Sequence, residues 1–300
     1  MDYSLFRFEA VVDFIEARIH TTKRNQGWKM KRALALHGIS YVKPVQPDAA
    51  GWSSQFTVRL YDPRNFAAMR SKLAIIEEKF PFTSPPTITM IEVAFDGYLK
   101  DLVRPSNRND LAVLAARMAY RNANQVSDNR RIYWQGKGSP RAMPRSLEGL
   151  EHKLAEGWNV GIGNKTAPQY QHCYVKTTDH NKKPIPAGDH RARFEIRLGR
   201  NHLPHTDIES YADFKFETLA QYICFRKEDE SATPLQQVIV AGYGAQASAR
   251  KSIKRRNGGG IRTSIMPRDE ELNRIVRKRL QTLTQRWQRT PPGAQKGPKS

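Results

Sequence analysis

The residues best suited to chemistry lie in the stretch 158–198, which contains Tyr174, Lys176 and Glu195. Three runs of strand-forming residues in this stretch are separated by Gly, Pro, Asn and Asp, which is typical of an antiparallel meander. These runs are residues 158–163, 171–177 and 191–198. A tyrosine hydroxyl, an ammonium group and a carboxylate are therefore predicted on neighbouring strands, where a buried strand would carry apolar side chains.

The last of these runs divides its side chains between two faces. Strand alternation puts the apolar residues on one face and the charged ones on the other. The apolar face carries Ala192, Phe194, Ile196 and Leu198, and the charged face carries Arg193, Glu195 and Arg197. Two interpretations are open: a solvated ion-pair face, or an active face on which Arg193 and Arg197 hold phosphate groups.

An acidic strand is predicted upstream, at residues 86–96. Alternation puts Glu92 and Asp96 on the same face of this strand, roughly 13 Å apart at most. If the strand pairs beside residues 191–198, Glu92 or Asp96 converges with Glu195 on a divalent metal, Mg²⁺ or Mn²⁺, because these ions prefer oxygen ligands. The alternative is that Asp96 and the following glycine only terminate the strand.

Tyr174 has the chemistry of a nucleophile. Its hydroxyl would attack a phosphodiester phosphorus, with a metal neutralising charge on the phosphoryl oxygens and Lys176 adding a positive group. The resulting phosphotyrosine bond keeps the ability to rejoin a 3′-hydroxyl without an external energy source. Tyrosine is also a common strand residue, so a structural role is the alternative. Tyr170 and Tyr211 are competing candidates for the nucleophile.

The charge of the chain favours a polyanionic partner. Its 50 Lys and Arg residues against 29 Asp and Glu give a net charge of +21, a balance that suits nucleic acid or an anionic membrane. Nucleic acid is favoured, and no membrane association is expected, because no apolar run approaches the ~20 residues of a membrane span. With 39% hydrophobic residues the chain has enough apolar side chains for a core.

The last fifth of the chain is its most basic part. From Arg250 onward, 15 Lys and Arg residues against 3 Asp and Glu contribute +12 of the +21. Within it, Lys251, Lys254, Arg255 and Arg256 are predicted to neutralise DNA phosphates, with the glycines that follow letting the loop track a groove. These glycines are not a nucleotide-binding loop, because they lack the Lys-Ser/Thr that such a loop requires.

The predicted elements give an α+β fold. We expect strands at 5–20 (helix is an alternative here), 39–45, 55–61, 86–96 and 130–135, besides the three runs above, and helices at 27–37, 65–80, 110–124, 147–156, 207–226 and 268–289. The order βαββαβ over residues 1–96 is that of a ferredoxin-like unit. The prediction is therefore two ferredoxin-like (RRM-like) halves, each an antiparallel sheet with covering helices, at 1–96 and 97–230, and a basic C-terminal extension at 231–300.

Several short motifs together resemble the replication initiation factor family of rolling-circle plasmids and filamentous phages. They are TITMIEVAFD (87–96), GIGNKTAPQYQHCYVKTTD (161–179) and RARFEIRL (191–198). They parallel, in order and spacing, the family's Ile-Asp-x-Ala-x-Asp strand, a strand with Gly and basic residues, a Tyr-x-Lys strand and an Arg-x-Glu-x-x-Leu strand. The resemblance covers roughly residues 85–226. Glu92 stands where the family usually has Asp, and the basic segment that ends at Lys165 is an imperfect match.

The resemblance implies an enzyme that nicks one DNA strand at an origin and stays linked to its 5′ end. Tyr174 would be the nucleophile and Lys176 its motif partner. A divalent metal, Mg or Mn, would be held by acidic residues, which are Glu92, Asp96 and Glu195 in this chain. Lys165 would contact the DNA backbone.

We therefore expect a metal-dependent rolling-circle initiator that nicks and rejoins DNA at a replication origin. A host helicase and a second copy of the chain are further expected partners. Two alternatives are a non-catalytic DNA-binding initiator or regulator, and an RNA-binding protein with exposed aromatics among Tyr133, Trp134 and Phe194. The start MDYSLFRFEA lacks secretory features, and Cys173 and Cys224 suit a reducing compartment, so we expect the cytoplasm. Cys173 is interpreted as a packed core thiol.

Overall fold

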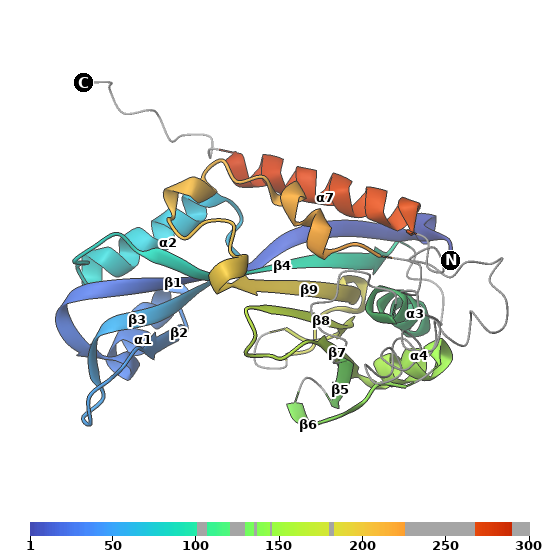
Figure 1. Cartoon of the computed structure of the whole chain (residues 1–300), viewed down its shortest axis with the longest axis horizontal. Helices are drawn as coiled ribbons and strands as arrows, with labels where there is room; N and C mark the ends of the chain where they lie inside the picture. Colours follow the sequence, from blue (N-terminus) through green and yellow to red (C-terminus); the bar gives the residue numbers. More distant parts are fainter. Residues whose placement is uncertain are drawn as a thin grey trace, which may run out of the picture. The chain divides into compact units, whose positions relative to one another are not determined.

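The structure is a computed structural model and has an α+β fold (Figure 1). It describes residues 1–100, 107–120, 130–134, 137–144, 146–179, 183–225 and 268–289. The strands are β1 Phe6–Gln26, β2 Tyr41–Pro44, β3 Trp52–Tyr61, β4 Thr87–Leu99, β5 Arg130–Trp134, β6 Lys137–Ala142, β7 Trp158–Ile162, β8 Gln169–Lys176 and β9 Arg191–Gly199. The α-helices are α1 Gly27–Leu34, α2 Phe66–Lys79, α3 Asn107–Tyr120, α4 Leu147–Glu156 and α7 Glu270–Gln288.

The described strands form one nine-stranded sheet in the order β2-β3-β1-β4-β9-β8-β7-β5-β6. The predicted meander is confirmed, since β7, β8 and β9 are consecutive neighbours in the sheet. The acidic strand β4 lies beside β9, which is the neighbour that the predicted metal site required. Strand β6 was not predicted. A division of the sheet into two ferredoxin-like halves stays a prediction.

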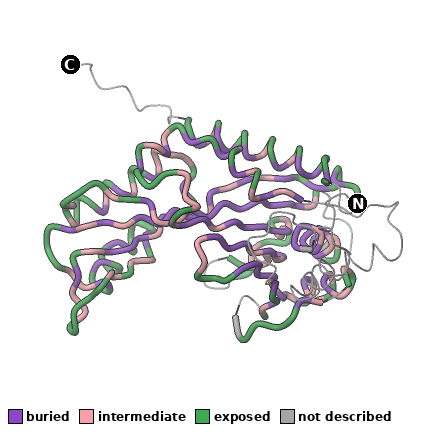
Figure 2. The backbone as a smooth tube through the Cα atoms, viewed as in Figure 1, coloured by how far each residue is buried: buried purple, intermediate pink, exposed green. Residues whose placement is uncertain are grey.

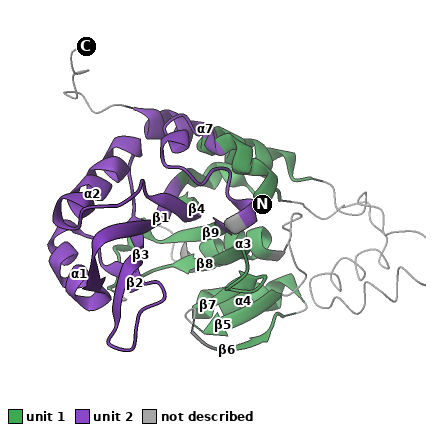
Figure 3. Ribbon diagram, turned by 60° about the vertical axis from the view of Figure 1, so that its left-hand side comes forward, with its two compact units in different colours: residues 1–10, 94–197, 217–280 green, residues 11–93, 198–216, 281–300 purple. Residues whose placement is uncertain are grey.

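The chain groups into two compact units, each drawn from separate stretches of sequence (Figure 3). Unit 1 comprises residues 1–10, 94–197 and 217–280, and unit 2 comprises residues 11–93, 198–216 and 281–300. Strands β1, β4 and β9 each have residues in both units. The contiguous domains predicted from the sequence, 1–96, 97–230 and 231–300, stay a prediction.

In unit 1 one face of the meander packs on helices. Helix α3 contacts β8 and α4 contacts β7, and most of α3 is buried (Figure 2). The Cys173 thiol donates a hydrogen bond to the carbonyl of Ala115 on α3 (3.2 Å) and has no exposed surface. Burial raises the pKa of this thiol, so the structure agrees with the interpretation of Cys173 as a packed core residue. Alternation then turns Tyr174 and His172 to the opposite face.

Unit 2 is built on the long antiparallel pair β1 and β3, in which Ile15 faces Leu60 and Ile19 faces Phe56. Helix α1 packs on β2 and β3 and buries Met30 and Leu34 completely. Asn65 precedes helix α2, and its side chain accepts a hydrogen bond from the amide of Ala68 (2.8 Å), as expected of an N-cap. Strand β1 spans Phe6–Gln26, so the strand predicted at 5–20 is confirmed over its helical alternative.

The helix predicted at 207–226 is wrong. The chain there forms short 3-10 turns, at Glu209–Tyr211 and Phe216–Tyr222. Side chains of α7 bond this backbone in place of helical hydrogen bonds: Thr284 accepts from the amide of Phe216, and Trp287 donates to the carbonyl of Tyr211. Backbone groups that form hydrogen bonds with side chains of α7 do not require a helix within the segment itself to satisfy them.

Helix α7 confirms the predicted helix at 268–289. Its buried side chains recur at helical spacing, at Leu272, Val276, Leu280, Leu283 and Trp287. Asp269 precedes the helix, accepts from the amide of Leu272 (3.0 Å) and also accepts from the hydroxyl of Tyr3 (2.5 Å). Among the described residues, no helix combines the length and the apolar character needed to cross a membrane.

Candidate active site

Strands β8 and β9 bring Tyr174 and Glu195 into direct contact. The Tyr174 hydroxyl donates a hydrogen bond to Oε1 of Glu195 (2.8 Å). Glu195 is buried, whereas Tyr174 is half-buried. The sequence placed these two side chains on facing strands, and the structure brings them within hydrogen-bonding distance.

The second carboxylate oxygen of Glu195 is held by His172. Nδ1 of His172 lies 3.2 Å from Oε2 of Glu195, and Nε2 lies 3.3 Å from the amide nitrogen of Asn159. An ionised carboxylate only accepts hydrogen bonds, so Nδ1 of His172 donates to Glu195. His172 and Tyr174 therefore each hold one oxygen of the Glu195 carboxylate, and Asn159 contacts His172 from the other side of its ring.

These contacts keep Glu195 ionised. Burial alone would raise the pKa of its carboxyl, but the hydrogen bond and charge of His172, the charge of Arg193 and the hydrogen bond from Tyr174 outweigh burial and lower it to about 2. A carboxyl with so low a pKa is a weak base and a good anionic ligand. Glu195 is thus suited to bind a cation and to orient the tyrosine hydroxyl.

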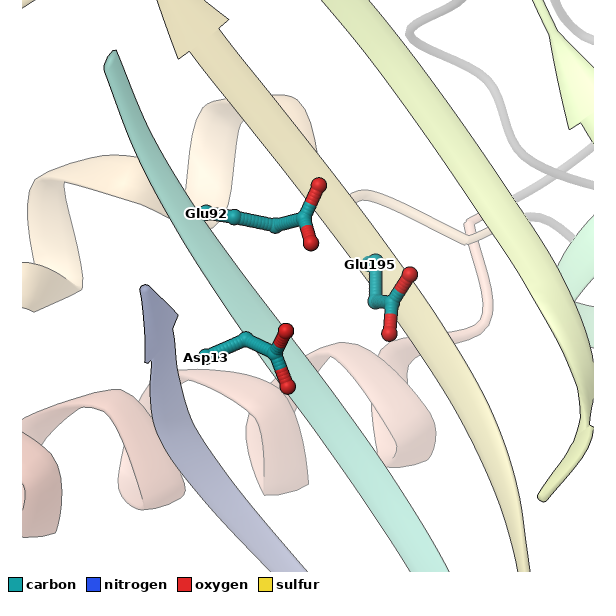
Figure 4. Close-up of side chains that lie close together, drawn as sticks. All are labelled: Asp13, Glu92 and Glu195. Atoms are coloured by element: carbon teal, nitrogen blue, oxygen red, sulfur yellow. The ribbon is translucent and has the colours of Figure 1, made fainter. Parts of the chain in front are cut away.

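Two further carboxylates lie near Glu195. Asp13 on β1, Glu92 on β4 and Glu195 on β9 each offer an oxygen, and these three oxygens lie within 4.8 Å of one another (Figure 4). Their strands are consecutive neighbours in the sheet, and the side chains point toward one another. Glu92 and Glu195 are buried and Asp13 is half-buried. We call these three residues the carboxylate cluster.

The carboxylate cluster fits a small divalent cation. A Mg²⁺ ion with bonds of about 2.1 Å holds its oxygen ligands at most about 4.2 Å apart, so small side-chain movements suffice. The donor set is all oxygen, which suits Mg²⁺ or Mn²⁺.

Asp96 lies outside the carboxylate cluster. It is fully buried, and Arg193 binds it through two hydrogen bonds, from Nε and Nη2, both of 2.7 Å. Nε of Arg191 lies 3.3 Å from the same carboxylate. The Arg193 side chain is 4% exposed, so in this structure it pairs with Asp96 and is not presented to a DNA phosphate.

The other predicted site residues on this face are basic and near tyrosines. Lys176 follows Tyr174 by two positions on β8, and its ammonium lies 3.5 Å from Asp179. Lys165 lies 4.0 Å from the ring centre of Tyr133, and Arg197 lies 5.5 Å from that of Tyr170. Lys165 is exposed and Arg197 is half-buried.

Lys165 and Arg197 are close enough for their charges to interact. Partial burial, and then the charge of Arg197, lower the pKa of the Lys165 ammonium. Gly161 lies beneath the two rings, since a β-carbon there would meet the Tyr170 hydroxyl at 2.5 Å and the Tyr133 ring at 2.8 Å. A glycine on β7 thus allows the two tyrosines beside these cations to pack close to the sheet.

The competing tyrosines are less suited to attack a substrate. Tyr170 is 3% exposed, and Tyr211 is fully buried with its hydroxyl donating to the carbonyl of His205 (3.0 Å). Phe194 is buried, as alternation predicted. The basic residues Lys251, Lys254, Arg255 and Arg256 lie outside the described residues.

Asp13 and Asn159 were missed as site residues. The sequence signal for Asp13 is its place on a long strand with apolar neighbours on both sides, where an acidic residue has no packing reason. Asn159 is opposite Tyr133 in the β5–β7 pair and close to His172. Strand register, which a single sequence does not give, is needed to place it.

Comparison with solved structures shows a distant likeness. No known family model and no curated protein matches the sequence. The solved structure of the rolling circle replication initiator protein from Geobacillus stearothermophilus is similar with a TM-score of 0.31 and 13% identity, over 76% of this chain and 90% of that one. A likeness at this level does not assign a fold or an activity to the chain.

The contacts of His172 predict a positioning role. Replacing His172 by Ala removes the donor to Glu195, and we expect Mn²⁺ affinity to fall about 10–100-fold, as for other residues that orient metal ligands. Binding of Mn²⁺ to the free protein, followed by calorimetry or electron paramagnetic resonance, measures this without any nicking assay. His172→Gln, which retains a donor, is expected to recover part of the affinity. Equal affinities for wild type and His172→Ala would show that His172 has no such role.

Proposed function

We propose that this chain is a metal-dependent DNA nicking and joining enzyme that initiates rolling-circle replication at an origin. The observation that carries the proposal is the hydrogen bond between the Tyr174 hydroxyl and Glu195 (2.8 Å), a carboxylate of the carboxylate cluster. The net charge of +21 supports a polyanionic substrate. A nucleophilic hydroxyl beside a cation-binding carboxylate is the arrangement that phosphoryl transfer requires.

In the proposed reaction the oxygen of Tyr174 attacks the phosphorus of one phosphodiester. A bond forms between the tyrosine oxygen and phosphorus, and the bond from phosphorus to the 3′-oxygen breaks. The proton that Tyr174 loses is balanced by the proton that the departing 3′-oxygen takes up. The 5′ end stays attached to Tyr174, and the reverse reaction rejoins the strand. Glu195 orients the hydroxyl, since a carboxyl whose pKa is about 2 is a weak proton acceptor.

Asp13, Glu92 and Glu195 would hold the divalent cation. A bound Mg²⁺ or Mn²⁺ would supply positive charge for the phosphoryl oxygens of the substrate. Lys176, two residues beyond Tyr174 on the same face of β8, adds a second positive group. His172 and Asn159 keep Glu195 oriented toward Tyr174.

Contacts with DNA are proposed for the basic residues on the Tyr174 face. Lys165 and Arg197 lie beside tyrosine rings and are close enough to influence each other. Lys251, Lys254, Arg255 and Arg256 are proposed to add phosphate contacts, which strengthen binding to any DNA sequence. A host helicase, a second copy of the chain and a cytoplasmic location stay predictions.

A covalent adduct tests the nucleophile. The chain is incubated with Mg²⁺ or Mn²⁺ and a random-sequence single-stranded oligonucleotide labelled at its 3′ end, and the products are separated on a denaturing gel. The label should migrate with the protein, because the 5′ end of the labelled fragment is linked to Tyr174. We expect Tyr174→Phe to abolish the adduct, while Tyr170→Phe and Tyr211→Phe keep it if they fold.

The same gel separates the proposal from its main alternative. A non-catalytic DNA-binding regulator forms no adduct with either metal in the wild-type protein, although it binds DNA in a salt-dependent way. An adduct of equal yield from Tyr174→Phe would exclude Tyr174 as the nucleophile. An oligonucleotide labelled at its 5′ end serves as the control, since its labelled fragment is released and should not remain on the protein.

A further inference from the structure

Helix α1 of unit 2 exposes two large apolar side chains. Trp28 is 60% exposed and Leu36, in the 3-10 turn after the helix, is 94% exposed, the two largest values among large hydrophobic residues of the described chain. Trp28 and Arg32 are four residues apart and share one face of α1. The opposite face, with Met30 and Leu34, is fully buried. The fold of unit 2 therefore uses the buried face of α1 and leaves the Trp28 face in solvent.

This exposed face lies in the longest acid-free part of unit 2. No Asp or Glu occurs between Glu16 and Asp48, and the intervening residues include seven basic ones: Arg18, Lys23, Arg24, Lys29, Lys31, Arg32 and Lys43. Asp48 is paired with Arg24 (2.5 Å). Within the part of the chain that the structure describes, Lys31 and Arg32 are exposed and have no carboxylate within ion-pair distance.

The positive charge of Lys29 lies close to the indole ring of Trp28. The ammonium of Lys29 lies 5.5 Å from the ring centre of Trp28 and 5.2 Å from that of Trp52. We define the α1 surface as Trp28, Lys29, Lys31, Arg32 and Leu36. It combines an exposed aromatic ring with cations that have no acidic partner, which are the two groups used by proteins that bind unpaired nucleic acid.

We propose that the α1 surface binds single-stranded DNA, with a base stacked on Trp28 and phosphates on Lys29, Lys31 and Arg32. The inference rests on the proposed function in taking DNA as the substrate. Single strands are favoured over duplex because base faces are hidden by stacking within a duplex, whereas an unpaired base offers its face to an indole. The α1 surface shares no residue with the active site, because Tyr174 lies on β8 and the carboxylate cluster lies on β1, β4 and β9.

Binding of oligothymidylate tests the proposal. Fluorescence anisotropy of the full chain is measured in EDTA with a labelled strand of about 15 nucleotides and with a duplex of the same length. We expect Trp28→Ala to weaken single-strand binding on the order of tenfold and to leave duplex binding unchanged. Trp28→Phe, which keeps an aromatic ring, should bind nearly as wild type. Trp134→Ala is the matched control, because Trp134 is 47% exposed and lies on β5.

The salt dependence tests the cations. Each of Lys31→Gln and Arg32→Gln should reduce the slope of log affinity against log salt by about 0.7 for the single strand. Unchanged melting temperatures are expected for all these variants, since the replaced side chains are exposed.

The proposal is overturned if Trp28→Ala binds the single strand as tightly as wild type. This result is also the one expected if the α1 surface binds another protein instead of DNA. Equal losses for single strand and duplex, or no binding of either by wild type, also overturn it. Nicking is not needed for any of these readouts. A protein that forms no adduct through Tyr174 but loses single-strand binding in Trp28→Ala would refute the proposed nicking and support this surface.

Discussion

Replacing Glu195 by Gln is expected to reduce nicking on the order of a thousandfold, because it removes the negative charge that would hold the cation. Binding of Mn²⁺ to the free protein should weaken in parallel. The substitution preserves shape and keeps an oxygen that can accept from the Tyr174 hydroxyl, which lies 2.8 Å from Oε1 in the wild type. The loss of nicking is therefore assigned mainly to the missing negative charge of Glu195. Single-turnover nicking at saturating Mg²⁺ measures it.

Asp13→Asn and Glu92→Gln extend the test to the other two members of the carboxylate cluster. Both should weaken Mn²⁺ binding, because their oxygens lie within 4.8 Å of Glu195. Glu156→Gln is the control, since this carboxylate is exposed and paired with Lys153 at 2.7 Å. Wild-type Mn²⁺ affinity in all three cluster variants would exclude the cluster as a metal site.

Strand periodicity predicted much of the local arrangement. Residues 191–198 carry apolar and charged side chains in strict alternation, and this pattern alone placed Phe194 in the core and Glu195 on the opposite face. The turn-forming residues between the runs predicted the neighbours β7, β8 and β9. These features are local, because a strand alternates with period two whatever it pairs with.

The sequence alone could not predict which residues of distant strands lie beside each other in the sheet. Alternation puts Glu92 and Asp96 on one face of β4 and leaves open which of them meets Glu195, and only the structure shows that Asp96 meets Arg193 and Glu92 joins the cluster. Asp13 was missed because its contribution depends on β1 being the neighbour of β4. The wrong helix at 207–226 has the same origin, since α7, far away in sequence, supplies the hydrogen bonds.

Asp96 is expected to stabilise the fold, and its replacement by Ala should cost about 3–5 kcal/mol of unfolding free energy, because it removes the carboxylate that binds the buried Arg193 guanidinium through two hydrogen bonds. Burial alone would lower the pKa of the Arg193 guanidinium, but the charge and hydrogen bonds of Asp96 raise it well above its usual value. Without Asp96 the guanidinium still stays charged, because an arginine side chain is not deprotonated in proteins, and Arg191 also loses the carboxylate 3.3 Å away. Urea denaturation in EDTA measures the loss in the absence of any metal.

A double replacement decides whether Asp96 acts through Arg193. Asp96→Leu combined with Arg193→Met removes both charges and fills the site with apolar side chains, and such exchanges of a buried pair are often neutral. We expect the double variant to recover most of the stability lost in Asp96→Ala, which a double-mutant cycle reports as coupling between the two positions. Because Arg193 also lies 3.5 Å from Glu195, the double variant should fold and yet bind Mn²⁺ with altered affinity. Stability that stays low in the double variant would show that Asp96 does not act through Arg193. An Asp96→Ala protein that is stable but no longer binds Mn²⁺ would instead make Asp96 a metal ligand and reverse the assignment of the two carboxylates on β4.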